Sequence, residues 1–365
     1  MKKYPKPSSL SKSQIDRFGD ILRAEKTETE EYQNVLSAIN IWRQSHFYPM
    51  NTFQSTLRRK IKEFDVKDFH PIAAQRLKRM PAIMNKLQRG QTEKMRLSRM
   101  QDIGGLRAIL KDVEQVYKLR DYYTKSGRFN NYNPREKDYL GEPKPDGYRG
   151  IHLIFTYNNV QSRSECARLY KGLHIELQIR TELEHIWATA VETVGTILGE
   201  NLKSDQGEDC WLRFFKLMSE VFAVIEHEQT PRTQIYFDEE KFKHNVDNIK
   251  RLDKQHKILD SLQGWSMATN EIHTSGFGGF YNLIVLDYDK KTVNVKLYSE
   301  NDVNSATKDY AKQEALSKNT NQVLVSTSDL KNLRKAYPNY FLDIQTFINY
   351  LRWVLGVDFN IKDLV

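Results

Sequence analysis

The sequence predicts an α+β protein in which helices pack on a mixed β-sheet. The clearest indication is the stretch from His174 to Arg180, where apolar and polar side chains alternate with the period of two that is typical of a strand. Around it, residues 51–204 alternate strand and helix patterns, which predicts the mixed sheet. Residues 265–365 repeat the theme on a smaller scale, in the order β-β-α-β-α.

The N-terminal residues 1–50 are predicted to form helices that pack on the central domain. Ser11 and Gln14 can form a capping box at a helix start. Apolar residues then recur at helical spacing, as Ile15, Phe18 and Leu22 and again as Tyr32, Leu36, Ile39 and Trp42.

In the central domain, residues 51–204, the patterns predict three strands, two helices and a long loop. The strands are Leu106–Leu110, Ile151–Tyr157 and Leu173–Arg180, the helices are Val113–Lys125 and Thr181–Gly199, and the polar loop is Asn130–Gly150.

Residues 205–264 carry a helical apolar stripe and are predicted to be a helical connector. After it, residues 265–365 are expected to be a separate small domain. Its strands are predicted at Tyr281–Asp287, Thr292–Tyr298 and Gln322–Ser326, and its helices at Ser305–Ser317 and Pro338–Leu355.

Composition favours a globular protein of the cytoplasm that binds a polyanion. The net charge is +9, and the segment from Arg58 to Arg99 alone has 13 Lys+Arg against 4 Asp+Glu. Such a concentration of positive charge attracts phosphate-rich ligands. No apolar run approaches the roughly 20 residues that span a bilayer, and the N-terminus lacks the apolar core of a signal peptide. With only two cysteines, we expect neither a disulfide framework nor a zinc site.

Three motifs occur in a fixed order. They are Asp102-Ile-Gly-Gly-Leu-Arg107, Lys144-Pro-Asp-Gly-Tyr-Arg-Gly-Ile-His152 and His174-Ile-Glu-Leu-Gln-Ile-Arg180. Together they resemble the synthetase domain of the RelA/SpoT family over about residues 50–200. The resemblance implies a nucleotidyltransferase-like fold that moves the pyrophosphate group of ATP to a ribose hydroxyl, with Mg²⁺ as cofactor.

The resemblance also assigns catalytic and acceptor-binding roles. It makes Asp102 a metal ligand, and it makes Glu176 either a second metal ligand or the general base for the attacking hydroxyl. Mg²⁺ prefers such oxygen ligands. Tyr148 is expected to project from its loop as an exposed platform that stacks on the acceptor base. The other residues expected around the acceptor are Lys144, His152, Gln178, Arg180 and His185.

ATP is expected to bind to the basic segment and to the first motif. By resemblance, Arg76 and Arg107 stack on the two faces of adenine, as guanidinium planes do. Arg76-Leu-Lys78-Arg79 and Lys86-x-x-Arg89 resemble the family's ATP-binding helix. The resemblance implies that the phosphates are neutralised by Lys78, Arg79, Lys86 and Arg89.

Two acceptors are compatible with the synthetase motifs. We favour the 3′ end of tRNA, as in the toxic small members of the family that stop translation, because the charge of the basic segment exceeds what one ATP needs. The alternative acceptor is GDP or GTP, which would make the product (p)ppGpp. A non-catalytic RNA-binding protein of the same fold is a further alternative. No His is followed by Asp, so the family's hydrolase motif is not in this sequence.

The C-terminal segment suggests regulation. It resembles the fused antitoxin domain of the CapRel subgroup, whose members defend bacteria against phage with a phage protein as trigger. In that subgroup a Tyr-x-x-Tyr pair masks the ATP site, and Tyr350 and Trp353 are the candidates here.

Overall fold

The computed structural model describes residues 8–24, 29–88, 95–158, 165–198, 202, 209–229, 239–266, 271–276, 279–287, 290, 292–316, 320–326, 336–337 and 344–357.

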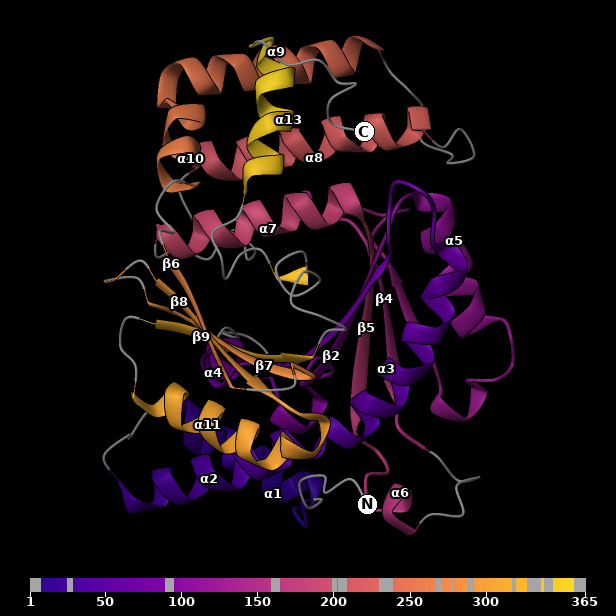
Figure 1. Cartoon of the computed structure of the whole chain (residues 1–365), viewed down its shortest axis with the longest axis vertical. Coiled ribbons are helices and arrows are strands. Elements are labelled where there is room, and N and C mark those ends of the chain that lie inside the picture. Colours follow the sequence, from indigo (N-terminus) through magenta and orange to yellow (C-terminus); the bar gives the residue numbers. More distant parts are fainter. Residues whose placement is uncertain are drawn as a thin grey trace.

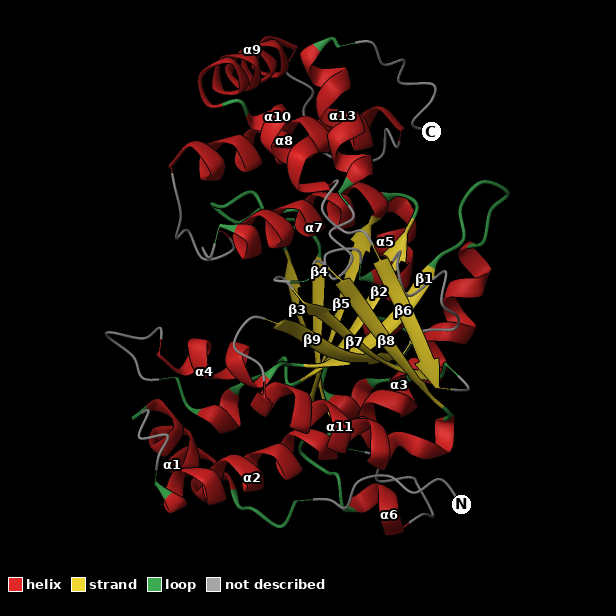
Figure 2. Ribbon diagram, turned by 60° about the vertical axis from the view of Figure 1, so that its left-hand side comes forward, coloured by secondary structure: helices red, strands yellow, loops and turns green. Residues whose placement is uncertain are grey.

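A nine-stranded mixed sheet is the centre of the molecule (Figure 2), in the order β3-β4-β5-β2-β1-β9-β7-β8-β6. β2 and β5 run parallel, whereas β1, β4 and β9 are antiparallel to their neighbours. The strands are β1 Ile72–Leu77, β2 Gly104–Leu110, β3 Arg135–Asp138, β4 Ile151–Thr156, β5 His174–Thr181, β6 Glu271–Gly276, β7 Tyr281–Asp287, β8 Thr292–Tyr298 and β9 Thr320–Ser326.

The helices gather in two groups at opposite ends of the view in Figure 1, with α7 to α10 and α13 at one end and α1, α2 and α11 at the other. Their bounds are α1 Lys12–Arg23, α2 Glu30–Ser45, α3 Phe47–Ile61, α4 Met80–Gln88, α5 Val113–Thr124, α6 Glu165–Arg168, α7 Glu182–Ile197, α8 Asp209–Gln229, α9 Glu239–His256, α10 Ile258–Ser266, α11 Val303–Leu316 and α13 Gln345–Leu355. None of the described helices is both long and apolar enough to span a membrane.

Two layers of side chains cover the sheet. One face buries Leu106, Ala108 and Leu177 in a core that also includes residues of α3, α5 and α11. The opposite face carries the polar side chains of β5, and α7 lies over it. Side chains of paired residues on neighbouring strands point to the same face, so this second face also carries Arg107, which pairs with Gln178, and His152, which pairs with the same residue.

Helix α7 begins as the sequence predicts. Thr181 is its N-cap, and the capping box with Glu184 is complete. The capping box at Ser11 and Gln14 is also present at the start of α1. The strand order and pairing confirm the expected α+β fold with a mixed sheet.

The C-terminal strands do not form a sheet of their own, which corrects the expectation of a separate small domain. β9 pairs with β1 at Gln75↔Ser326 and Arg76↔Val325, so β9, β7, β8 and β6 extend the central sheet. Helix α13 packs instead with α7, α9 and α10 of the helical group. The elements after residue 264 are thus shared between the sheet and the helical connector.

Three strands were missed or misassigned. Arg76 lies on β1 and not on an ATP-binding helix, while α4 begins only at Met80. β3 lies inside the segment Asn130–Gly150 that was expected to be a loop, and β6 precedes the strands expected at the C-terminus. The start of the helix expected from Pro338 lies outside the described residues, and α13 begins at Gln345.

Candidate functional site

Five of the expected site residues form a closed ring of hydrogen bonds on the polar face of the sheet. The Tyr148 hydroxyl is 2.5 Å from Nε2 of His152, whose Nδ1 is 3.0 Å from Oε1 of Glu176. Gln178 donates to Oε2 of Glu176 at 2.8 Å, and Arg180 donates to Oε1 of Gln178 at 2.9 Å. Arg180 closes the ring, because its Nε donates to the Tyr148 hydroxyl at 3.2 Å.

The strand register explains why these residues meet. Glu176, Gln178 and Arg180 are two residues apart on β5 and therefore point to one face. His152 on β4 is directly opposite Gln178. Tyr148 comes from the loop before β4, where Gly147 has a φ of +90°. A residue with a side chain rarely adopts that φ, so glycine permits the turn that brings Tyr148 back over the strands.

The Glu176 carboxylate is ionised and held in one orientation. The residue is only 8% exposed, and burial by itself would favour the neutral acid. His152 overcomes this effect through its charge and its hydrogen bond, and the net result is that the pKa of Glu176 is lowered. Glu176 is therefore ionised at neutral pH and is held in place by two hydrogen-bond partners.

Tyr148 is buried, which corrects the expectation of an exposed platform. It is 7% exposed, with the Arg180 guanidinium 5.2 Å and the Lys144 ammonium 4.9 Å from the centre of its ring. Trp187 and Tyr139 also pack near the ring. Burial raises the pKa of the Tyr148 hydroxyl to about 12, against the opposing charge of Arg180.

Asp102 precedes β2 and is the second expected carboxylate. Lys78 and Lys86 both bond to it, at 2.6 Å and 3.1 Å. Although burial favours the neutral acid, the two lysines hold the pKa of Asp102 well below its usual range. The charge of Asp102 in turn acts on Glu176, so the two carboxylates are electrostatic neighbours.

This pair of carboxylates fits a Mg²⁺ ion. Mg²⁺ is commonly bound through one or two carboxylates, with substrate phosphates and water completing its shell. The described residues contain no group of three or more His, Cys, Asp or Glu arranged to hold a metal ion. Asp102 and Glu176 would then be the protein ligands, and Lys78 and Lys86 bond to Asp102.

The two expected adenine-stacking arginines lie on adjacent strands and on the same face. Arg76 pairs with Gly105 and Arg107 with Ala74 in the β1–β2 register. Burial lowers the pKa of Arg107 to about 10, and the charges of Arg180 and Arg76 add to the effect. The two guanidinium groups are thus close enough to repel each other.

The C-terminal segment contacts Arg107 directly. Its Nη1 donates to the backbone carbonyl of Ala336 at 2.9 Å, and its guanidinium lies 5.4 Å from the centre of the Tyr337 ring. Tyr337 is 1% exposed and packs with apolar residues of the same sheet face. The Tyr337 ring therefore lies against the Arg107 guanidinium, which was expected to stack on adenine.

The aromatic pair predicted to mask the ATP site lies elsewhere. Tyr350 is buried on α13, where its ring is 5.2 Å from that of Phe222 on α8, and Trp353 packs against the same helical core. A spacing with two tyrosines, Tyr337-Pro-Asn-Tyr340, lies earlier in the sequence and includes the ring that contacts Arg107, whereas the expected pair ends in Trp353. Tyr340 itself lies outside the described residues.

The remaining expected residues are placed as follows. Arg79 bonds to Asn321 of β9, and Arg89 lies outside the described residues. Lys144 lies against the rings of Tyr139 and Tyr148. His185 is buried in the first turn of α7, two helical turns before Glu192, whose charge acts on Arg107. His185 therefore lies on the side of α7 that faces the sheet.

A basic groove that was not predicted lies on the same face of the sheet as the ring of hydrogen bonds. Its volume is about 740 Å³, and it continues along β4 and β5 at Thr156 and His174, on the same face as Glu176. Lys12, Arg96, Arg99 and Arg135 line it together with one carboxylate, Asp16. The excess of positive charge in Arg58–Arg99 could have indicated Arg96 and Arg99, whereas Lys12 and Arg135 come from distant segments.

The sequence around this site matches known proteins. Residues 75–194 match the model of the "Region found in RelA / SpoT proteins". The chain is 26% identical over 160 residues to the GTP pyrophosphokinase YjbM of Bacillus subtilis, a match that covers 42% of this chain and 72% of that protein. It is 31% identical over 118 residues to the GTP pyrophosphokinase YwaC of the same organism, over 31% of this chain and 52% of that protein.

Solved structures include similar chains. Small alarmone synthetase 1 from Bacillus subtilis, bound to its product pppGpp, has 21% identity and a TM-score of 0.42 over 51% of this chain and 92% of its own. A GTP pyrophosphokinase family protein from Streptococcus pneumoniae has 20% identity and a TM-score of 0.41 over 60% and 97%. The family match spans β1 to α7, and so it contains every residue of the hydrogen-bonded ring together with Asp102 and Arg107. Residues 75–194 therefore form a RelA/SpoT region, and the chain is a pyrophosphotransferase that uses ATP.

Proposed function

We propose that this enzyme transfers the pyrophosphate group of ATP to the ribose hydroxyl at the 3′ end of tRNA, and that it thereby blocks translation in the cytoplasm. The observation that carries the choice of acceptor is the basic groove, which reaches His174, two residues before Glu176 on the same face of β5. Its four basic side chains, Lys12, Arg96, Arg99 and Arg135, would bind the RNA backbone that continues from a terminal nucleotide.

The site residues divide the work of the reaction. The acceptor hydroxyl oxygen forms a bond to the β-phosphorus of ATP, the bond from that phosphorus to the bridging oxygen of the α-phosphate breaks, and AMP leaves. Glu176 takes the proton of the hydroxyl, since it is ionised at neutral pH and His152 and Gln178 hold it in one orientation. A Mg²⁺ ion on Asp102 and Glu176 would neutralise the charge of the phosphates.

The ribose and base of the acceptor would be positioned around Tyr148. Because the ring is buried between Lys144 and Arg180, the acceptor base would have to displace one of these cations to stack on it. His185, on the sheet-facing side of α7, is the remaining candidate for this pocket.

The C-terminal segment would keep the enzyme inactive. Tyr337 and Ala336 engage Arg107, so adenine cannot stack on that face of the guanidinium until the segment moves. In this proposal residues 265–365 act as the regulatory part of a CapRel-type toxin–antitoxin fusion, and a phage protein that binds them would be the trigger. Tyr337 takes the role that we expected for Tyr350 and Trp353.

A second candidate acceptor is GDP or GTP. It is favoured by the names of the two curated relatives, which are GTP pyrophosphokinases. The same catalytic residues would serve, and the product would be (p)ppGpp.

One experiment separates these acceptors. Purified full-length protein is incubated with Mg²⁺ and ATP that is labelled on the terminal phosphate, together with deacylated tRNA, GDP or GTP in separate reactions. The Tyr337→Ala variant is tested in parallel, because the proposed closed state would limit turnover of the wild type. We expect label on tRNA and more label with Tyr337→Ala. Label on guanosine nucleotides alone would instead make the enzyme a (p)ppGpp synthetase.

A further inference from the structure

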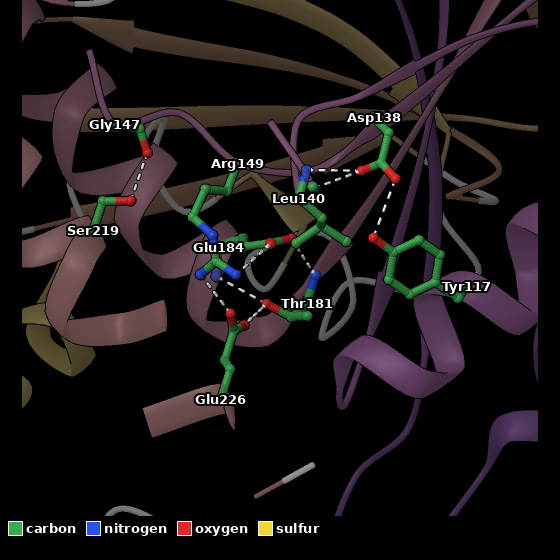
Figure 3. A network of polar contacts seen from close by, with 10 residues as sticks. Tyr117, Asp138, Leu140, Gly147, Arg149, Thr181, Glu184, Ser219 and Glu226 are labelled. Atoms are coloured by element: carbon green, nitrogen blue, oxygen red, sulfur yellow. Dashed lines mark hydrogen bonds and ion pairs between the residues drawn. The ribbon is translucent and has the colours of Figure 1, made fainter. Parts of the chain in front are cut away.

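Helix α8 holds the loop that carries Tyr148 from its outer side (Figure 3). Ser219 on α8 donates from its hydroxyl to the Gly147 carbonyl at 2.5 Å, and both residues are buried. The backbones are so close that a Cβ on Gly147 would lie 3.1 Å from Cα of Lys216. Helix α8 follows residue 194 and lies outside the RelA/SpoT match. The loop that carries Tyr148 is therefore held by a helix of the connector, and not only by residues of the matched region.

A buried carboxylate of the same helix ties the loop to the catalytic strand. Glu226 pairs with Arg149 at 2.6 Å, with the two side chains 5% and 4% exposed. Its second oxygen accepts a hydrogen bond from the Thr181 hydroxyl, also buried. Thr181 is both the last residue of β5 and the N-cap of α7. One carboxylate therefore joins the acceptor loop, the end of β5 and the start of α7 (Figure 3).

The second carboxylate near Arg149 is a weaker partner. Glu184 is 4.0 Å from the guanidinium, and it is already engaged as the capping-box acceptor of the Thr181 amide. Burial raises the pKa of Glu184 to about 8, and the charge of Glu226 adds to the effect. By distance, Glu226 is therefore the closer partner of Arg149.

The geometry links this outer contact to the ring of hydrogen bonds. Tyr148 and Arg149 are consecutive in the loop, and Arg180 and Thr181 are consecutive in β5. On the inner side Arg180 bonds directly to Tyr148. On the outer side Thr181 and Arg149 are joined through Glu226. The loop is therefore fastened to the end of β5 twice, once on each side.

We propose that Glu226 is a positioning residue for the acceptor: through Arg149 it fixes Tyr148 where the hydroxyl-bearing substrate binds. This proposal deepens the proposed function and rests on it for the identity of the substrate site. Removing the charge of Glu226 leaves a buried guanidinium without its close partner, so the loop gains freedom to move away from β5. The ATP side is built from β1 and the segment before β2, whereas Glu226 is on α8, so we expect the ATP side to keep its geometry.

Hydrogen–deuterium exchange on the full-length protein tests the proposal without requiring turnover. The amides of Lys144, Gly147 and Tyr148 are all hydrogen-bonded within the loop, so their exchange reports on its order. In Glu226→Gln we expect about tenfold faster exchange in residues 144–150, with the amides of β2 unchanged. The matched control is Glu220→Gln on the same helix, where the carboxylate pairs with Lys241 and accepts from Asn245 of α9. It should leave the loop unchanged.

Steady-state kinetics are the second measurement. The acceptor is the one that the wild type labels among deacylated tRNA, GDP and GTP. Glu226→Gln should raise the KM for that acceptor about tenfold and change the KM for ATP less than about twofold. Ser219→Ala removes a smaller contact to the same loop and should act in the same direction, which keeps the test open should Glu226→Gln not fold.

Two results would overturn the proposal. One is loop exchange that stays as in the wild type, and the other is exchange that rises equally in the loop and in β2, since that would be a general loss of stability. A wild type that labels none of the three acceptors would count against the proposed function alone, because the exchange comparison still decides the role of Glu226.

Discussion

The Arg107 guanidinium lies 5.4 Å from the centre of the Tyr337 ring and donates a hydrogen bond to the adjacent Ala336 carbonyl. That hydrogen bond spans 229 positions of the sequence, and it links the family domain to the C-terminal segment. A cation over an aromatic face is stabilised by about 0.5–2 kcal/mol, with the larger values in desolvated sites such as this one. In the proposed function adenine uses the same kind of contact, so the Tyr337 ring and the nucleotide would compete for one face of Arg107.

We therefore expect Tyr337→Ala to increase the affinity for ATP. Removal of the competing ring should strengthen ATP binding by about tenfold, which corresponds to roughly 1.4 kcal/mol. Equilibrium binding of a non-hydrolysable ATP analogue measures the effect. Tyr350→Ala is the matched control, because its ring packs on Phe222 in the helical core, and it should not strengthen binding. Equal affinities of wild type and Tyr337→Ala would contradict competition at this face.

Glu176→Gln should abolish pyrophosphate transfer while the fold and ATP binding persist. The amide keeps the shape of the side chain and can accept from Gln178, but it cannot take a proton from the acceptor hydroxyl. General base catalysis contributes about 100-fold to 10,000-fold, and we expect a decrease of that size in kcat. Initial rates with labelled ATP measure it.

The control for this variant is Glu136→Gln, at an exposed position of β3 that pairs with Arg120. It should turn over like the wild type. Transfer by Glu176→Gln at more than about a tenth of the wild-type rate would show that another group accepts the proton.

The basic groove predicts a charge reversal that affects a nucleic-acid acceptor selectively. Arg135 is exposed at the groove, on a strand next to β4. Arg135→Glu should weaken tRNA binding and reduce the slope of log K against log salt by about 0.7 for each phosphate that the protein no longer neutralises. Lys308→Glu makes the same charge change on α11, which packs on the opposite face of the sheet, and is the control. If both variants bind tRNA alike at all salt concentrations, the groove is not part of the acceptor site.

The sequence was sufficient to predict the polar face of β5, because this strand is apolar on one side only. β1 was missed for the opposite reason. It is buried on both faces at all of its positions except the partly exposed Arg76, so Ile72 to Leu77 shows no alternation of apolar and polar residues. The resemblance of Arg76-Leu-Lys78-Arg79 to the family's ATP-binding helix then suggested a helix. Periodicity alone does not identify a short strand that is buried on both faces, and β1 also lacks the longer run of apolar residues by which β7 could be predicted.

Non-local pairing explains the remaining differences. The strand at Thr320–Ser326 was predicted, but nothing in its sequence indicates that its partner is β1. For the same reason the contact of Tyr337 with Arg107 and the pair Arg149–Glu226 could not be foreseen. One practical consequence is that deletion of residues 266–365 would strip β9 from the edge of β1, so point variants are the better test of inhibition.

The buried carboxyl of Glu184 predicts a pH-dependent stability with a definite sign. Its pKa is about 8 in the folded protein and near 4.5 as a reference for the unfolded chain, chiefly because burial disfavours the charged form. Between these values the folded protein binds the extra proton, so the free energy of unfolding falls as the pH rises from about 5 to about 8. Glu184→Gln, a neutral isostere, should lack this part of the slope. Urea unfolding at several pH values measures it, and Glu182→Gln, at an exposed position of the same turn, should keep the wild-type slope. Parallel stability curves for wild type and Glu184→Gln would mean that Glu184 is ionised in the folded state, with Arg149 shared between two carboxylates.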